Sequence, residues 1–167
     1  MKFLTLLVVL ICGGVLQAVL PTWALFGRAP APVLTALVIY YALTRSRTAV
    51  LWIAVLAGVV QDALGLIPLG YSSFCLCLVA LLFHRYRDEV FVWAGVTHMV
   101  FGGIAALGVT LAQALLLGFG AEVAVSAGDV ARKALGAAVL GIATTPLVYV
   151  AVEKLDLMLG NVELQRT

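Results

Sequence analysis

Charged side chains are scarce in this sequence. Asp, Glu, Lys and Arg make up 11% of its 167 residues, whereas a soluble domain carries about a quarter. The longest polar stretch, residues 84–89, is too short to form a domain outside a membrane, and the net charge of +2 is too small to indicate a nucleic-acid partner. With 64% hydrophobic residues and a mean hydropathy of +1.16, the composition predicts a polytopic membrane protein.

Motifs for catalysis and metal binding are also absent from the sequence. It contains no Gly-x-Ser-x-Gly, no phosphate-binding glycine loop and no pair of carboxylates within one apolar run. Cys75 and Cys77 lie about 200° apart on a helix, so they cannot bind one metal ion together. His84 and His98 have no acidic residue at ligand spacing, and we expect them at an interface and against a neighbouring helix, respectively. The sequence therefore predicts neither an enzyme nor a cofactor or metal site.

Runs without charge predict six transmembrane helices in one all-α domain over residues 1–167. The expected spans are 3–21, 30–44, 48–64, 71–83, 92–118 and 134–152. Since roughly 20 apolar residues are needed to cross the hydrocarbon core, the second and fourth spans are short. They require a thinner bilayer or shielding by neighbouring helices. Five spans with one re-entrant segment remain an alternative.

The first apolar run also has the general form of a signal peptide. It continues past Cys12 to Pro21 without a polar cleavage region, which favours a retained span over cleavage or lipidation. Basic residues in short loops then predict the orientation. Both termini are expected in the cytoplasm, because that side collects seven basic residues against three. The inner set is Lys2, Arg45, Arg47, Arg85, Arg87, Lys154 and Arg166, and the outer set is Arg28, Arg132 and Lys133.

Asp62 is the only charged residue between positions 48 and 83. It is expected in the last turn of a helix, where a carboxylate faces the negative end of the helix dipole and needs hydrogen-bond donors. The turn that follows contains Pro68 and Gly70, and the next helix opens with unpaired backbone N–H groups. We therefore expect Asp62 and Gln61 to pin the two helices together through this turn. An interfacial position, a partner contact and proton or ion coupling remain alternatives for Asp62.

Small residues recur at four-residue spacing in the last two predicted spans. Such positions let helix backbones approach closely in lipid. The pattern is compatible with packing inside the bundle and with docking of another protein's helix. The residues concerned are Gly102, Ala106, Gly108 and Ala112 in the fifth span, and Ala134, Ala137, Ala138 and Gly141 in the sixth.

The stretch "APVLTALVIYYALTRSRTAVLWIAVLAGVVQDALGLIPLGYSS" resembles the rod shape-determining protein MreD family. That family has a proline-led second helix, an aromatic–Ala–Leu segment before a basic turn, a Gly-x-x-x-Asp third helix and a Pro–Leu–Gly turn. The resemblance covers residues 30–87. The matching positions are Pro32, Tyr41, Ala42, Leu43, Arg45, Arg47, Gly58, Asp62, Pro68, Leu69 and Gly70.

The resemblance implies a non-enzymatic scaffold of the bacterial cell-elongation (rod) complex in the inner membrane. It implies binding to MreC in support of lateral peptidoglycan synthesis by RodA and a class B penicillin-binding transpeptidase. The cytoskeletal filament protein MreB is expected beneath this membrane complex. The resemblance also implies a fold similar to the substrate-binding subunits of energy-coupling-factor transporters. Such a vitamin-binding subunit is one alternative function, although residues 3–21 lack its Ala-x-x-x-Ala surface. A small ion or lipid transporter is the other. We expect the MreC contact on a helix flank or in the loop 119–132.

Overall fold

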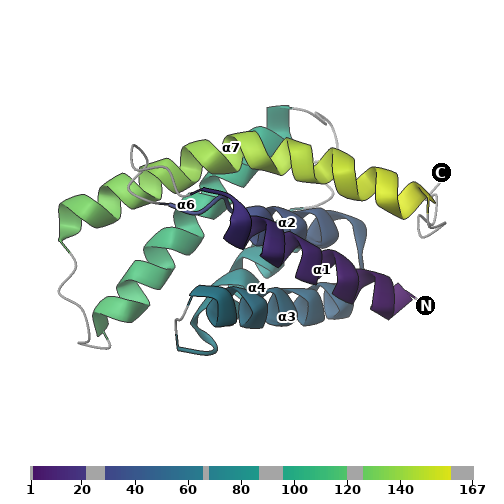
Figure 1. Ribbon diagram of the computed structural model, residues 1–167, viewed down its shortest axis with the longest axis horizontal. Helices are drawn as coiled ribbons and strands as arrows, with labels where there is room; N and C mark the ends of the chain where they lie inside the picture. Colours follow the sequence, from purple (N-terminus) through teal and green to yellow (C-terminus); the bar gives the residue numbers. More distant parts are fainter. Residues whose placement is uncertain (1, 22–28, 66–67, 87–95, 120–125, 159–167) are drawn as a thin grey trace.

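A computed structural model describes the chain except for residues 1, 22–28, 66–67, 87–95, 120–125 and 159–167. Within the described residues all regular elements are helices, which confirms the all-α class (Figure 1). Arg28, Arg87 and Arg166 of the predicted orientation lie outside the described residues, as do residues 120–125 of the predicted loop 119–132. The helices are α1 (Lys2–Val19), α2 (Val33–Thr44), α3 (Arg47–Gly65), α4 (Tyr71–Arg85), α6 (Val96–Phe119) and α7 (Ala127–Met158).

Three of these helices are long and apolar enough to cross a membrane. They are α3, residues 97–118 of α6, and α7, while α2, α4 and residues 6–19 of α1 are shorter apolar helices. Large hydrophobic side chains also face outward, among them Trp52 on α3, which is 65% exposed, and Leu147 on α7, which is 71% exposed. Because soluble monomers rarely expose broad apolar faces, these helices indicate a membrane protein.

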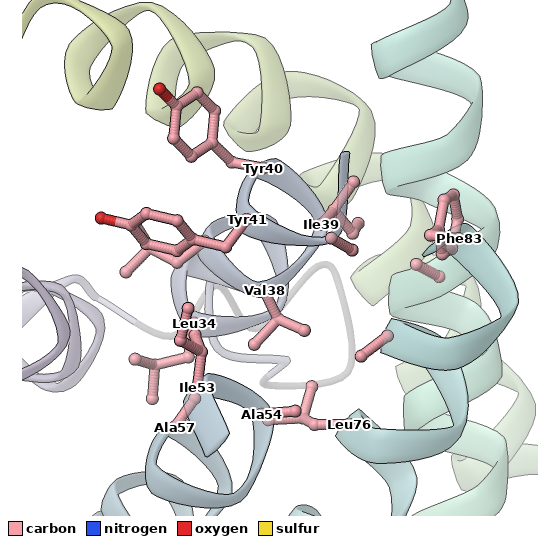
Figure 2. Close-up of a cluster of buried hydrophobic side chains, with 14 of the residues drawn as sticks. Leu34, Val38, Ile39, Tyr40, Tyr41, Ile53, Ala54, Ala57, Leu76 and Phe83 are labelled. Atoms are coloured by element: carbon pink, nitrogen blue, oxygen red, sulfur yellow. The ribbon is translucent and has the colours of Figure 1, made fainter. Parts of the chain in front are cut away.

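Helix α2 is the centre of the bundle. Its residues from Val33 to Leu43 are all buried, and it contacts α1, α3, α4, α6 and α7. Figure 2 shows Leu34 and Val38 of α2 above Ala54 of α3 and Leu76 of α4. A helix that is apolar on every side belongs in the interior. Shielding by neighbours is therefore how the structure accommodates this 12-residue helix.

Helix α4 is also short, with 15 residues, but it is not enclosed in the same way. Phe74, Leu78 and Leu82 lie on one exposed face, each more than half exposed. Ser72, Cys75 and Leu76 are buried on the other side. The two short helices predicted from the sequence thus have different environments, and shielding explains only α2.

Two helix hairpins make the most extensive contacts in the described chain, α3 with α4 and α6 with α7. Helix α1 packs on α2 and α3. The start of α1 and the end of α7 lie at the same end of the molecule (Figure 1). We call this the Arg45 end, because the α2–α3 turn with Arg45 is also there, and we call the opposite end, with the α3–α4 turn, the Asp62 end.

Two helices, α2 and α7, illustrate how the observed boundaries differ from the predicted ones. Helix α2 begins at Val33 rather than at residue 30, with Pro32 at its N-cap position. Proline disfavours helical backbone in the residue before it, so Ala31 cannot extend the helix. Helix α7 has 32 residues and continues through Pro146, well beyond the predicted span 134–152. The predicted span followed the charge-free run alone, whereas the helix continues through the charged residues at both of its ends.

Candidate functional site

Asp62 lies where its side chain joins α3 to the start of α4. Its carboxylate is 1% exposed. Oδ2 accepts a hydrogen bond of 2.7 Å from the backbone N–H of Gly70, and Oδ1 accepts one of 3.0 Å from the N–H of Ser72. These N–H groups lie at the N-cap and in the first turn of α4, where they have no acceptor within the helix. The hydrogen bonds expected from Asp62 to the turn are therefore present.

The turn depends on backbone geometry that favours glycine. Gly70 has φ of 107° at the N-cap of α4, a left-handed conformation that costs other residues free energy. Pro68 lies in the same turn, is exposed, and has a carbonyl 3.5 Å from the N–H of Tyr71. Pro68 therefore shapes the turn, whereas the contact with the carboxylate comes from Gly70 and the residue two positions later.

The same cluster reaches a third helix. Ser72 is fully buried, and its Oγ accepts a 2.7 Å hydrogen bond from Nε2 of Gln113 on α6. We call Asp62, Gly70, Ser72 and Gln113 the Asp62 cluster. A carboxylate, a helix N-terminus and an amide thus connect α3, α4 and α6. A satisfied polar network of this kind fixes the relative position of helices in an apolar interior.

Gly58, four residues before Asp62, allows α3 and α4 to approach closely. A Cβ atom at this position would overlap the Cα and N atoms of Ser73. The Ser73 hydroxyl also donates a 3.1 Å hydrogen bond to the carbonyl of Val55. The Gly-x-x-x-Asp pattern therefore combines close backbone packing with a carboxylate that caps the partner helix.

Gln61 does not take part in this contact, so the prediction that it bonds to the turn is wrong. Successive helical residues point about 100° apart, so Gln61 and Asp62 cannot both face α4. The Gln61 Oε1 atom is buried and has no hydrogen-bond partner in the described part of the chain. Its side chain instead lines a cavity between the helices at the Asp62 end.

The cavity has a volume of about 230 Å³. It lies between α1, α2, α3, α6 and α7, and three glutamines, two threonines and one lysine contribute to its wall. The lining residues are Gln17, Ala18, Ala29, Pro30, Pro32, Thr35, Gln61, Leu64, Gly65, Ala106, Val109, Thr110, Gln113, Lys133 and Ala137. A concave site with a few polar groups among apolar ones is the usual form of a small-molecule pocket.

The small residues of α6 and α7 pack against each other. A Cβ on Gly102 would overlap Thr145 Oγ1, and one on Gly141 would lie 2.8 Å from Cβ of Ala106. A Cβ on Gly103 would come within 3.3 Å of the carbonyl oxygen of Ala138. The small-residue pattern is therefore used within the bundle at these positions, which was one of its two expected uses.

A second buried carboxylate, not identified from the sequence, lies at the Arg45 end. Asp156 of α7 is 5% exposed. Its Oδ2 accepts a 3.2 Å hydrogen bond from the Tyr40 hydroxyl and lies 3.6 Å from Nη2 of Arg45. In the sequence, Asp156 follows Glu153 and Lys154 and looks like part of a solvated helix end. Only the fold brings it to residues more than 100 positions earlier.

The histidines have structural contacts. The His98 ring stacks on Tyr149 of α7, with centroids 4.1 Å apart and 28° between the planes. Nδ1 of His84 lies 3.1 Å from the carbonyl oxygen of Ala42. Within the described ranges, no group of three His, Cys, Asp or Glu residues is arranged to hold a metal ion.

No protein-family model matches the chain, and no similar protein is found among curated proteins or solved structures. The resemblance to the MreD family, and the fold that it implies, therefore remain predictions from the residues at 30–87.

Proposed function

We propose that the chain is a non-enzymatic scaffold of the bacterial rod complex, located in the inner membrane. In this role it binds MreC and supports lateral peptidoglycan synthesis by RodA and a class B penicillin-binding transpeptidase, with MreB beneath. One observation carries the proposal. Gly58, Asp62 and Gly70, which belong to the pattern that resembles MreD, meet at the α3–α4 contact through close packing and a hydrogen bond.

The arrangement supports a scaffold because it holds two helices rigidly while their outer faces remain exposed. Trp52, Val55 and Val59 form an exposed apolar row on α3, as do Phe74 and Leu78 on α4. Residues at this spacing share one helix face. A rigid hairpin with apolar outer faces is suited to contact lipid and the transmembrane helices of partners.

The proposed topology has six spans with both termini in the cytoplasm. The start of α1 and the end of α7 lie at one end of the bundle (Figure 1), as an even number of crossings requires. In this orientation the Arg45 end faces the cytoplasm, and the Asp62 end, with the cavity, faces outward. The positive-inside rule supports this assignment.

The cavity favours a second candidate function, the substrate-binding subunit of an energy-coupling-factor transporter. Its wall contains Gln17, Gln61 and Gln113 from three different helices. The fold brings these three side chains, which lie far apart in the sequence, to one cavity. A transporter subunit of this kind requires such a pocket, whereas a scaffold does not.

Affinity purification of the tagged chain from its native membrane, in mild detergent, tests the proposal. We expect MreC and the rod-complex synthases to copurify, and we expect Asp62→Ala to reduce MreC recovery severalfold at equal chain abundance. Asp129→Ala is the matched control, because Asp129 is an exposed carboxylate at the same end of the bundle. Recovery of an ATPase pair in place of MreC would contradict the scaffold and support the transporter subunit.

A further inference from the structure

The cavity has a buried floor and an exposed rim. Ala29, Thr35 and Ala106 of its wall are each at most 3% exposed, whereas Leu64 and Lys133 are exposed. A molecule could therefore enter from the rim and lose contact with water at the floor. The volume of about 230 Å³ is below the range of about 300–1,000 Å³ for pockets of drug-sized ligands. The site fits a smaller molecule.

The polar groups of the wall include both hydrogen-bond donors and acceptors. Gln17 Oε1 accepts a 3.0 Å hydrogen bond from the N–H of Leu34, so its amide NH2 group remains as a donor. Gln61 Oε1 is buried without a partner among the described residues, and buried acceptors are nearly always satisfied by protein, water or a ligand. Gln113 uses its Nε2 on Ser72, which leaves its Oε1 to accept. The Thr110 hydroxyl donates its proton to the carbonyl of Ala106 and retains its lone pairs. Hydroxyl groups, which both donate and accept, match such a wall.

Charge restricts the ligand further. Among the described residues of the cavity wall, Lys133 is the single charged one, and none of them is a carboxylate. An ammonium group at the rim attracts an anion and disfavours a cation. The described wall thus combines amide and hydroxyl groups inside with a positive group at its opening.

We propose that this cavity binds a glycerol phosphate group. The hydroxyl groups donate to Gln61, Gln113 and Thr110, and the phosphate pairs with Lys133. The same chemistry occurs in the headgroup of phosphatidylglycerol and in free glycerol 3-phosphate. This inference goes beyond the proposed scaffold function and rests on the cavity alone. Copurification of MreC can therefore succeed or fail independently of it.

The experiment uses the full chain in two arms. In the first, glycerol 3-phosphate is titrated into detergent-purified protein by calorimetry, with glycerol and inorganic phosphate as chemical controls. In the second, native mass spectrometry measures lipid retained from bicelles that contain phosphatidylglycerol or phosphatidylcholine. Binding in the first arm identifies a free solute as a ligand, and selective retention of phosphatidylglycerol in the second identifies a lipid headgroup.

Matched variants test the residues. Gln61→Leu and Lys133→Gln should each weaken binding about tenfold, the effect of losing one strong hydrogen bond. Thr110→Val should weaken it severalfold. Thr144→Val is its control, because Thr144 makes the same 2.8 Å bond to its own helix without lining the cavity. Arg132→Gln is the control for Lys133, and both controls should stay within twofold of the parent chain.

Two results would overturn the proposal. One is the absence of binding in both arms, which would leave the cavity to water. The other is equal weakening by the cavity variants and their controls, which would place the binding elsewhere. Each variant is first checked for its unfolding midpoint, so that a loss of fold is distinguished from a loss of binding.

Discussion

Asp62→Ala is the substitution whose effect on stability follows most directly from the structure. It removes the acceptor of two backbone N–H groups, those of Gly70 and Ser72. The two groups differ in their surroundings, since Gly70 is exposed and Ser72 is fully buried. Water can replace the carboxylate at the first N–H but not at the second.

The expected loss of unfolding free energy in Asp62→Ala is the sum of two unequal contributions. The buried N–H of Ser72, left without an acceptor, costs about 1–3 kcal/mol, and exchange of the Gly70 bond for water costs about 1 kcal/mol. Hydrogen bonds in membrane proteins average about 0.6 kcal/mol in double-mutant cycles, because the unfolded chain in lipid also finds partners. We therefore expect the free energy of unfolding to fall by about 2–3 kcal/mol. Asp62→Asn keeps one acceptor and should cost about half as much.

The assay is equilibrium unfolding in mixed micelles, with sodium dodecyl sulfate as the denaturant and helicity as the signal. Glu153→Ala is the control, because Glu153 is an exposed carboxylate, and it should change stability by less than about 0.5 kcal/mol. If Asp62→Ala unfolds within that same margin of the parent chain, the carboxylate does not stabilise the hairpin. An equal loss with Asn and Ala would show that charge, rather than the acceptor geometry, is responsible.

Four further substitutions are expected to have measurable effects in the same unfolding assay. Gly58→Ala should destabilise the chain by about 1–3 kcal/mol, because the added Cβ overlaps the α4 backbone. Gly108→Ala should stabilise it by up to about 1 kcal/mol, because the space around Gly108 is open. Equal effects of the two substitutions would contradict the close packing of α3 on α4. Gly70→Ala should cost about 1–3 kcal/mol through its positive φ, and no loss would show that the turn relaxes. Asp156→Asn should lower the free energy of unfolding by about 1–2 kcal/mol, because it weakens the contacts of α7 with α2 and with the α2–α3 turn. Glu153→Gln is the control and should leave the free energy of unfolding unchanged. Equal losses from the two substitutions would refute a specific role for Asp156.

The helices and the Asp62 contact could be predicted because their signals are local in the sequence. Charge-free runs identify the apolar helices, and a carboxylate before a glycine-containing turn needs donors within a few residues. Helix ends were less predictable, since α7 remains helical through its charged residues on both sides of the apolar run. Gln61 was misplaced because adjacency in sequence was taken for adjacency in space.

The contacts that were missed join distant parts of the chain. Gln113 meets Ser72 across 41 positions, and Asp156 meets Tyr40 across 116. No periodicity or spacing in a single sequence identifies such pairs, because the helix packing that creates them depends on every intervening helix. The cavity is a feature of the same kind, since its wall is drawn from five helices and the segment before α2.

The burial of α2 has a consequence for biogenesis. This helix is synthesised before α7, yet Tyr40 in it packs edge-on against Tyr149 of α7, with ring centroids 4.9 Å apart. A nascent chain that stops before α7 leaves one side of its central helix unpaired. Membrane quality control that recognises unpaired helices therefore has a structural difference to act on, which is the presence or absence of the α2–α7 contact with its Tyr40–Asp156 hydrogen bond.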